Sequence, residues 1–288
     1  MIRRNPYHPV GYFYKGAALQ ARMLDAEDYR QATEFYTLMD KTISTADSLL
    51  QQDPDNAWVL FYKGSAFLYR SYMKAKENDW LPAYRDALKG VGSLETAVEC
   101  DSLLYDAYLG VGSFKYWKSA RTEFLNWLPI IKDEQEKGIR MVRTAVEQGI
   151  FVHWIARDQL CWILLDDGQL EEALQIAGEN AEAFPQSRFF KWTLVSALER
   201  TGRSEEAYQQ YQDLLQQVRS LPQNNGYNEI ECLVSMAEIQ FKKENYHLAF
   251  QHADEALRLR LPQQVRSRVR KKLQKALDIR SSSAEYLP

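Results

Sequence analysis

Few residues in this sequence have the types and spacing that covalent or metal chemistry requires. The histidines are His8, His153, His247 and His252. They form no HExxH motif and no pair four residues apart, the arrangement with which a helix binds zinc. The cysteines, which are too far apart for a CxxC metal pair or a disulfide framework, are Cys100, Cys161 and Cys232. The sequence therefore predicts a protein that is not an enzyme and that needs no metal and no cofactor.

Composition narrows the class of partner. The formal net charge is −3, whereas nucleic-acid-binding proteins usually carry a basic field. No run of 18 apolar residues could span a membrane, and the start of the chain lacks the apolar stretch of a signal peptide. We therefore expect a soluble protein that binds no nucleic acid and is cytoplasmic by default. The alternative is an exported, periplasmic protein whose sequence starts at a trimmed end.

A hexapeptide recurs at a fixed interval and indicates repeats. Residues 13–18 read FYKGAA, and residues 61–66, which lie 48 positions later, read FYKGSA. Glycines at 16, 64 and 112 continue the same step. A fixed period in this range is typical of stacked structural repeats. The pattern predicts three long repeats over residues 1–150.

Each long repeat reads as two helices. In the second repeat we expect helices over 55–77 and 83–99, separated by a break that contains Trp80. The third repeat follows the same plan, with helices over 103–120 and 133–148 and a break that contains Trp127. We expect both tryptophans to be buried and to anchor the connections.

The period is shorter after residue 150. DGQLEEA at 167–173 and TGRSEEA at 201–207 each predict a glycine turn followed by the start of a helix. Three short repeats are expected over 151–262. A capping helix over 263–280 and a disordered tail over 281–288 complete the prediction.

These residues resemble the tetratricopeptide repeat (TPR) family. Cys161, Gly168, Ala173 and Pro185 stand at the family's positions 8, 15, 20 and 32. The resemblance is stronger over 151–260 than over 5–149, where the repeats are longer. It implies an all-α, right-handed solenoid of helical hairpins. It also places Cys161 at a packing position, where a buried, unreactive thiol is expected.

The resemblance further implies a concave, aromatic-lined surface. Partner-binding residues are expected there at Trp58, Phe61, Tyr69, Asp106, Tyr116, Trp117, Trp162 and Trp192. Aromatic side chains with a few charges are typical of recognition surfaces. The family's Lys, Asn and Arg clamp for a peptide carboxylate is absent, because Phe13 and Ala17 occupy its first two positions. The alternative is that these aromatic rings pack on one another and fill the groove.

The function implied is a non-enzymatic scaffold that binds a protein or peptide segment. We expect its site in the long repeats, where Asp106 would favour a basic residue of the ligand. The alternative is a helical-repeat protein that binds a small ligand or lipid, or that assists an enzyme.

Three features have consequences for packing and assembly. Gly16, Gly64 and Gly112 inside helices each cost about 1 kcal/mol relative to Ala, so we expect close helix contacts that compensate. The uncapped start of the first helix suggests a homodimer through residues 10–25. Residues 258–280 carry nine Lys or Arg and one Asp, which fits a capping helix with a solvated face or a surface for an anionic partner.

Overall fold

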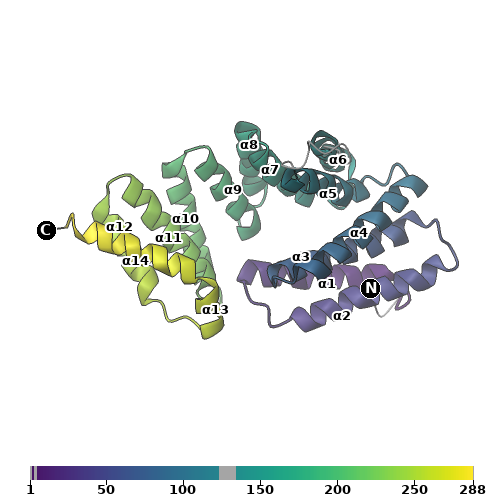
Figure 1. Ribbon diagram of the computed structural model, residues 1–288, viewed down its shortest axis with the longest axis horizontal. Coiled ribbons are helices and arrows are strands. Elements are labelled where there is room, and N and C mark those ends of the chain that lie inside the picture. Colours follow the sequence, from purple (N-terminus) through teal and green to yellow (C-terminus); the bar gives the residue numbers. More distant parts are fainter. Residues whose placement is uncertain (1, 3–4, 123–133, 288) are drawn as a thin grey trace. The chain divides into compact units, whose positions relative to one another are not determined.

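Stacked helical hairpins make up the part of the chain that the computed structural model describes, residues 2, 5–122 and 134–287 (Figure 1). Every regular element within these residues is a helix, as the repeat pattern predicts. The helices group into two bodies. The first comprises Met1–Met23 with Tyr29–Asp167, and the second comprises Leu24–Asp28 with Gly168–Pro288.

The first body contains the long hairpins. Its helices are α1 (Pro9–Ala26), α2 (Ala32–Leu50), α3 (Ala57–Lys76), α4 (Trp80–Cys100), α5 (Asp106–Thr122), α6 (Gln135–Gln148) and α7 (His153–Asp166). From α2 to α7, each helix packs against the next one along the chain. The start of α3 is set by Asn56, whose side chain accepts a hydrogen bond from the Val59 N–H at 3.1 Å. The predicted helices over 55–77 and 83–99 correspond to α3 and α4.

The connection between α3 and α4 differs from the sequence expectation. Trp80 is 65% exposed, so the prediction that it is buried and anchors this connection is wrong. The chain turns instead through Asn78, which has a left-handed backbone with φ of 64°. The N–H of Asp79 then donates to the Lys74 carbonyl at 2.9 Å and satisfies the end of α3. Trp127, for which burial was also predicted, lies outside the described residues.

Paired glycines allow the helices of a long hairpin to touch through their backbones. A Cβ added to Gly64 of α3 would lie 2.7 Å from the carbonyl oxygen of Gly90 in α4, and a Cβ on Gly90 would lie 2.9 Å from that of Gly64. Gly112 of α5 and Gly138 of α6 repeat this arrangement. A Cβ on Gly112 would lie 2.8 Å from the Gly138 carbonyl oxygen, and a Cβ on Gly138 would lie 2.6 Å from the Gly112 carbonyl oxygen. The close contact expected at Gly64 and Gly112 is therefore confirmed. Their partners, Gly90 and Gly138, are separated by the same repeat period.

A buried carboxylate fastens three helices of the first body together. Asp86 of α4 accepts hydrogen bonds from the Arg70 guanidinium at 2.6 and 2.7 Å and from the Lys74 ammonium at 2.7 Å, both on α3. Arg70 also pairs with Asp40 of α2. Burial by itself would raise the pKa of Asp86, but the bonds from Arg70 and Lys74 outweigh it and hold the pKa below its ordinary value.

The exposed side of α1 does not carry the wide apolar face that a dimer through residues 10–25 would need. Tyr14, which is 38% exposed, is the one large apolar side chain of this helix classed as exposed. Lys15, Ala18, Ala21 and Arg22 make up the rest of its exposed positions. The homodimer expectation therefore has no support in the surface of α1.

The second body contains the short hairpins and the C-terminal helices. Its helices are α8 (Leu170–Ala183), α9 (Arg188–Arg200), α10 (Ser204–Arg219), α11 (Tyr227–Lys242), α12 (Tyr246–Arg258), α13 (Gln263–Arg268) and α14 (Arg270–Ala284). Gly168 and Gly202 stand at the predicted turns with φ of 82° and 75°, the left-handed region that glycine adopts without strain.

The C-terminal region differs in two respects from the single helix and disordered tail expected. Residues 263–280 form two helices, α13 and α14, and α14 continues to Ala284, so that the first half of the expected tail is helical. Tyr286 then stacks on Tyr246 of α12 with ring centroids 4.0 Å apart.

The basic residues of this region are largely used within the chain. Lys272 and Lys275 pair with Glu231 and Glu238 of α11, and Arg280 pairs with Asp254 of α12. These pairs hold α14 against the last hairpin, which favours the capping interpretation over a surface for an anionic partner.

We predict opposite effects of alanine at two glycines of α3 and α4. Gly64→Ala forces a methyl group against the Gly90 carbonyl and should lower the free energy of unfolding by about 1–3 kcal/mol. Gly92→Ala is the matched control, because a Cβ there meets nothing within 4 Å. It should raise stability by up to about 1 kcal/mol through better helix propensity. Urea denaturation measures both, and equal stability of the two variants would contradict the close contact.

Asp86→Asn should destabilise the protein in a pH-dependent way. At neutral pH it leaves Arg70 and Lys74 facing a neutral amide, which we expect to cost about 2–3 kcal/mol. The folded-state pKa of Asp86 lies below its ordinary value of 3.8. The stabilisation by the Asp86 charge is therefore complete above pH 3.8 and is lost as the pH falls from there through the folded-state pKa. The difference in unfolding free energy between the native protein and the variant should therefore shrink below about pH 4. A difference that stayed constant down to acid pH would contradict this assignment.

Candidate functional site

Aromatic rings from α1, α3 and the α6–α7 link meet on the first body. Four of these rings, which we call the aromatic surface, are Tyr14, Trp58, Tyr62 and Phe151. Tyr14 and Phe151 are exposed, Trp58 is half-buried and Tyr62 is buried among them. The ring centroid of Trp58 lies 5.7 Å from that of Phe151, edge to face, and 6.1 Å from that of Tyr62. The centroids of Tyr62 and Tyr14 are also 6.1 Å apart. These distances are typical of favourable ring pairs, so the four side chains support one another.

The repeat places this surface on an inner layer of rings. Phe13 and Phe61 are buried in equivalent positions of α1 and α3, with ring centroids 6.5 Å apart. Tyr14 and Tyr62 follow them directly in the sequence and contact one another. Phe13 also meets Tyr69, with ring centroids 5.3 Å apart. Phe13, Phe61 and Tyr62 thus fill the interior, while Tyr14 reaches the surface.

Asp106 holds the link that carries Phe151. Its carboxylate, 2% exposed, accepts hydrogen bonds from the backbone N–H groups of Ile150, Phe151 and Val152 at 3.0, 2.7 and 3.0 Å. The negative charge is therefore bound by the protein's own backbone. Asp106 therefore positions a neighbouring ring. It is not open to a basic residue of a ligand, although the sequence had suggested that role.

The tyrosines of this surface remain neutral phenols at physiological pH. Burial raises the pKa of Tyr62 to about 12, and the nearby Tyr14 and Asp106 contribute to the rise. Burial also raises the pKa of Tyr14. The Tyr62 hydroxyl is hydrogen-bonded to that of Tyr14, and neither phenol carries charge that would oppose an apolar contact.

An exposed apolar rim continues from the aromatic surface along the chain. Phe151 is 62% exposed, and Ile150, Trp154 and Ile155 are also exposed. Four large apolar side chains exposed so close together in the sequence form a patch of the kind that marks interaction sites. Phe151 joins this rim to the rings of α1 and α3.

Comparison with known proteins identifies the fold. No protein-family profile and no curated protein sequence matches the chain. Among solved structures it resembles PilW, a type IV pilus biogenesis factor and TPR protein, with 16% identity, a TM-score of 0.54 and coverage of 92% of this chain and 98% of PilW.

The chain has the tetratricopeptide repeat fold.

Two further TPR structures are matched less closely. The TPR protein YrrB is 15% identical, with a TM-score of 0.47 and coverage of 78% of this chain and 97% of YrrB. A TPR protein from Parabacteroides merdae is 12% identical, with a TM-score of 0.46 and coverage of 96% of this chain and 88% of its own.

The TPR fold brings together only some of the residues mapped to its concave face. Trp58 and Phe61 lie in the ring cluster, and Tyr69 joins it through Phe13. Tyr116 is buried and its hydroxyl donates to Asp166 at 3.0 Å, which gives it a structural role.

The other tryptophans predicted to bind a partner make different contacts. Trp117 meets the ring of Tyr116, with centroids 5.1 Å apart. Trp117 sits on α5 with Arg121 over its ring at 5.4 Å. Trp162 is half-buried on α7. Trp192 belongs to the second body, where its ring contacts Tyr211 at 6.3 Å. Their roles as partner-binding residues stay predictions.

Sequence reasoning missed three members of the aromatic surface. Tyr14 and Tyr62 carry a usable signal, because each follows a mapped or equivalent phenylalanine within the recurring hexapeptide. Phe151 carries a weaker one, because it stands one long repeat period after Leu103, another exposed apolar residue in a link. No local pattern shows that Asp106 would bring Phe151 against Trp58.

The described residues offer little else that could do chemistry. Within them, no group of three His, Cys, Asp or Glu side chains could hold a metal ion, and no helix is long and apolar enough to cross a membrane. Cys161 is fully buried, and burial raises the pKa of its thiol to about 12. This thiol stays protonated at neutral pH and is a poor nucleophile.

Asp106→Ala should loosen the link that carries Phe151. Three backbone N–H groups lose a charged acceptor, so we expect a loss of about 3 kcal/mol in stability and faster hydrogen exchange at residues 150–152. Asp101→Ala is the matched control in the α4–α5 link, where the carboxylate accepts one N–H bond, from Leu103 at 2.9 Å. Unchanged exchange at residues 150–152 would contradict the anchoring role of Asp106.

Proposed function

We propose that this protein is a non-enzymatic scaffold that binds a segment of another protein on its aromatic surface. The observation that carries the proposal is the position of Phe151, an exposed ring held against Trp58 by a buried carboxylate. The exposed part of this side chain contributes no stability to the isolated chain. A partner that covered it would gain the free energy of burying both the ring and the adjoining apolar rim.

The surface has the features of a protein interface. Aromatic side chains dominate the energetically important centres of such interfaces, because they bury a large area at a small loss of conformational entropy. The inner rings beneath Tyr14 and Trp58 support the outer ones, so little freedom remains to be lost on binding. The neutral hydroxyl of the exposed Tyr14 can bond to the partner's backbone.

The exposure of this surface favours a protein segment over a small ligand or lipid. Small-molecule sites are concave and enclose most of the ligand. Phe151, Ile150 and Trp154 instead stand open to solvent at the end of a helical hairpin. A partner segment lying across them could cover several exposed side chains at once.

Removing the exposed ring should weaken partner binding without affecting the fold. Partners recovered with the native protein and identified by mass spectrometry would be titrated against Phe151→Ser and Trp58→Ala. We expect affinity to fall at least about tenfold, equivalent to about 1.4 kcal/mol. Phe151→Ser should leave stability nearly unchanged, because its side chain is mostly exposed.

Trp80→Ala is the matched control, since it removes an exposed tryptophan at the other end of α3, about 30 Å away. Lys271→Ala, at an exposed position of α14, tests the basic helix. Both should bind normally. Equal binding by Phe151→Ser and the native protein, or loss of binding with Lys271→Ala alone, would overturn the proposal.

A further inference from the structure

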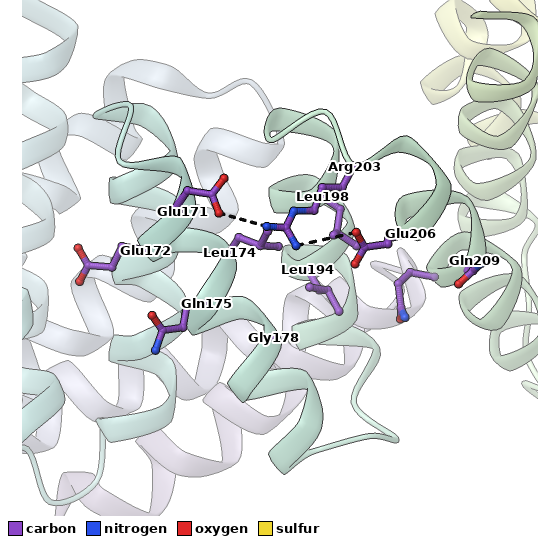
Figure 2. A pocket seen from close by; sticks show the side chains of 11 residues that line it. Glu171, Glu172, Leu174, Gln175, Gly178, Leu194, Leu198, Arg203, Glu206 and Gln209 are labelled. Atoms are coloured by element: carbon purple, nitrogen blue, oxygen red, sulfur yellow. Dashed lines mark hydrogen bonds and ion pairs between the residues drawn. The ribbon is translucent and has the colours of Figure 1, made fainter. Parts of the chain in front are cut away.

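The second body contains a cleft that is separate from the aromatic surface. It has a volume of about 660 Å³ and lies between α8 and α10, which both pack on α9 (Figure 2). Leu174, Leu194 and Leu198 contribute apolar side chains to its lining. Gln175 of α8 and Gln209 of α10 line opposite sides, as Figure 2 shows. Leu194 is partly exposed, whereas Leu174 and Leu198 are buried, so the cleft offers a small apolar area beside amide groups that can bond to a peptide.

Gly178 keeps one wall of the cleft free of a side chain. A Cβ at this position in α8 would meet nothing within 4 Å, unlike the glycines that join α3 to α4. Glycine inside a helix costs about 1 kcal/mol relative to alanine, and no helix contact compensates for it here. The equivalent position in the next short repeat is Gln212. What glycine provides at position 178 is open space along the wall of the cleft.

The cleft has an excess of negative charge. Its charged lining residues are Glu171, Glu172, Glu206 and Arg203. Arg203 lies between two of these carboxylates, 3.2 Å from Glu171 of α8 and 3.9 Å from Glu206 of α10 (Figure 2). Three carboxylates against one guanidinium leave a formal charge of −2.

We propose that this cleft is a second docking site, which takes a helical segment of a partner protein with leucine-like side chains on one face and lysine or arginine beside them. The apolar face would lie on the leucines, and the basic side chains would lie along the acidic residues, where their charge is complementary. An amphipathic helix in a groove is a recurring mode of peptide recognition. Electrostatic attraction would make the association fast and dependent on salt.

The full-length protein can be tested with a fluorescent helical peptide that has leucines on one face and lysines along both edges of that face. Its twin, with glutamate in place of lysine, controls for apolar binding alone. The decisive variant is Gly178→Gln, which places in the cleft the side chain found at the equivalent position of the next repeat. Glutamine has the better helix propensity, so this variant should fold at least as well as the native protein. Gly92→Gln is the matched control, because position 92 is also open but lies on α4.

We expect the lysine peptide to bind the native protein and Gly92→Gln equally, and to bind Gly178→Gln about tenfold more weakly. Glu206→Gln should also weaken binding, and added salt should reduce it further. Phe151→Ser should bind as the native protein does, which separates this site from the aromatic surface. Equal affinity of Gly178→Gln and Gly92→Gln, equal binding of the glutamate peptide, or no binding of either peptide would overturn the proposal.

Discussion

Contact between the backbones of paired helices is the constraint on which the long hairpins depend. Gly64 with Gly90, and Gly112 with Gly138, bring two helices closer than any side chain would permit. Each glycine is unfavourable within its own helix, so the stability must come from packing along the full length of the hairpin. The same pair recurs one repeat period later, which gives the second and third hairpins the same closely packed pairing.

The rings of the first body perform two different tasks. Phe13 and Phe61 are buried and fill the space between α1 and α3, whereas Trp58 and Phe151 extend the same cluster to the surface. A self-filled core and the aromatic surface are therefore successive layers of one cluster. The buried charge of Asp106 connects the layers, because it fixes the backbone from which Phe151 projects.

The two bodies use glycine and charge in different ways. In the first body, glycines allow helix contact, and the buried Asp86 ties α4 to Arg70 and Lys74. In the second body, Gly168 and Gly202 form the turns between helices, and Gly178 leaves space along α8 in the cleft that exposed carboxylates line. The lysines of α14 that pair with acidic residues of α11 show that much of the charge of that helix serves packing.

The sequence by itself determined the repeat, the all-α class and the turns, because period and glycine position follow from local geometry. The hexapeptide at 13–18 and 61–66 predicted hairpins whose helices are now seen as α1 and α3. The fate of individual side chains was decided by the tertiary structure. Asp106 is occupied because three N–H groups of a distant link reach it, and the same link brings Phe151 against Trp58. Such long-range contacts join residues far apart in the chain, and no local pattern encodes which side chain will be covered when neighbouring hairpins stack.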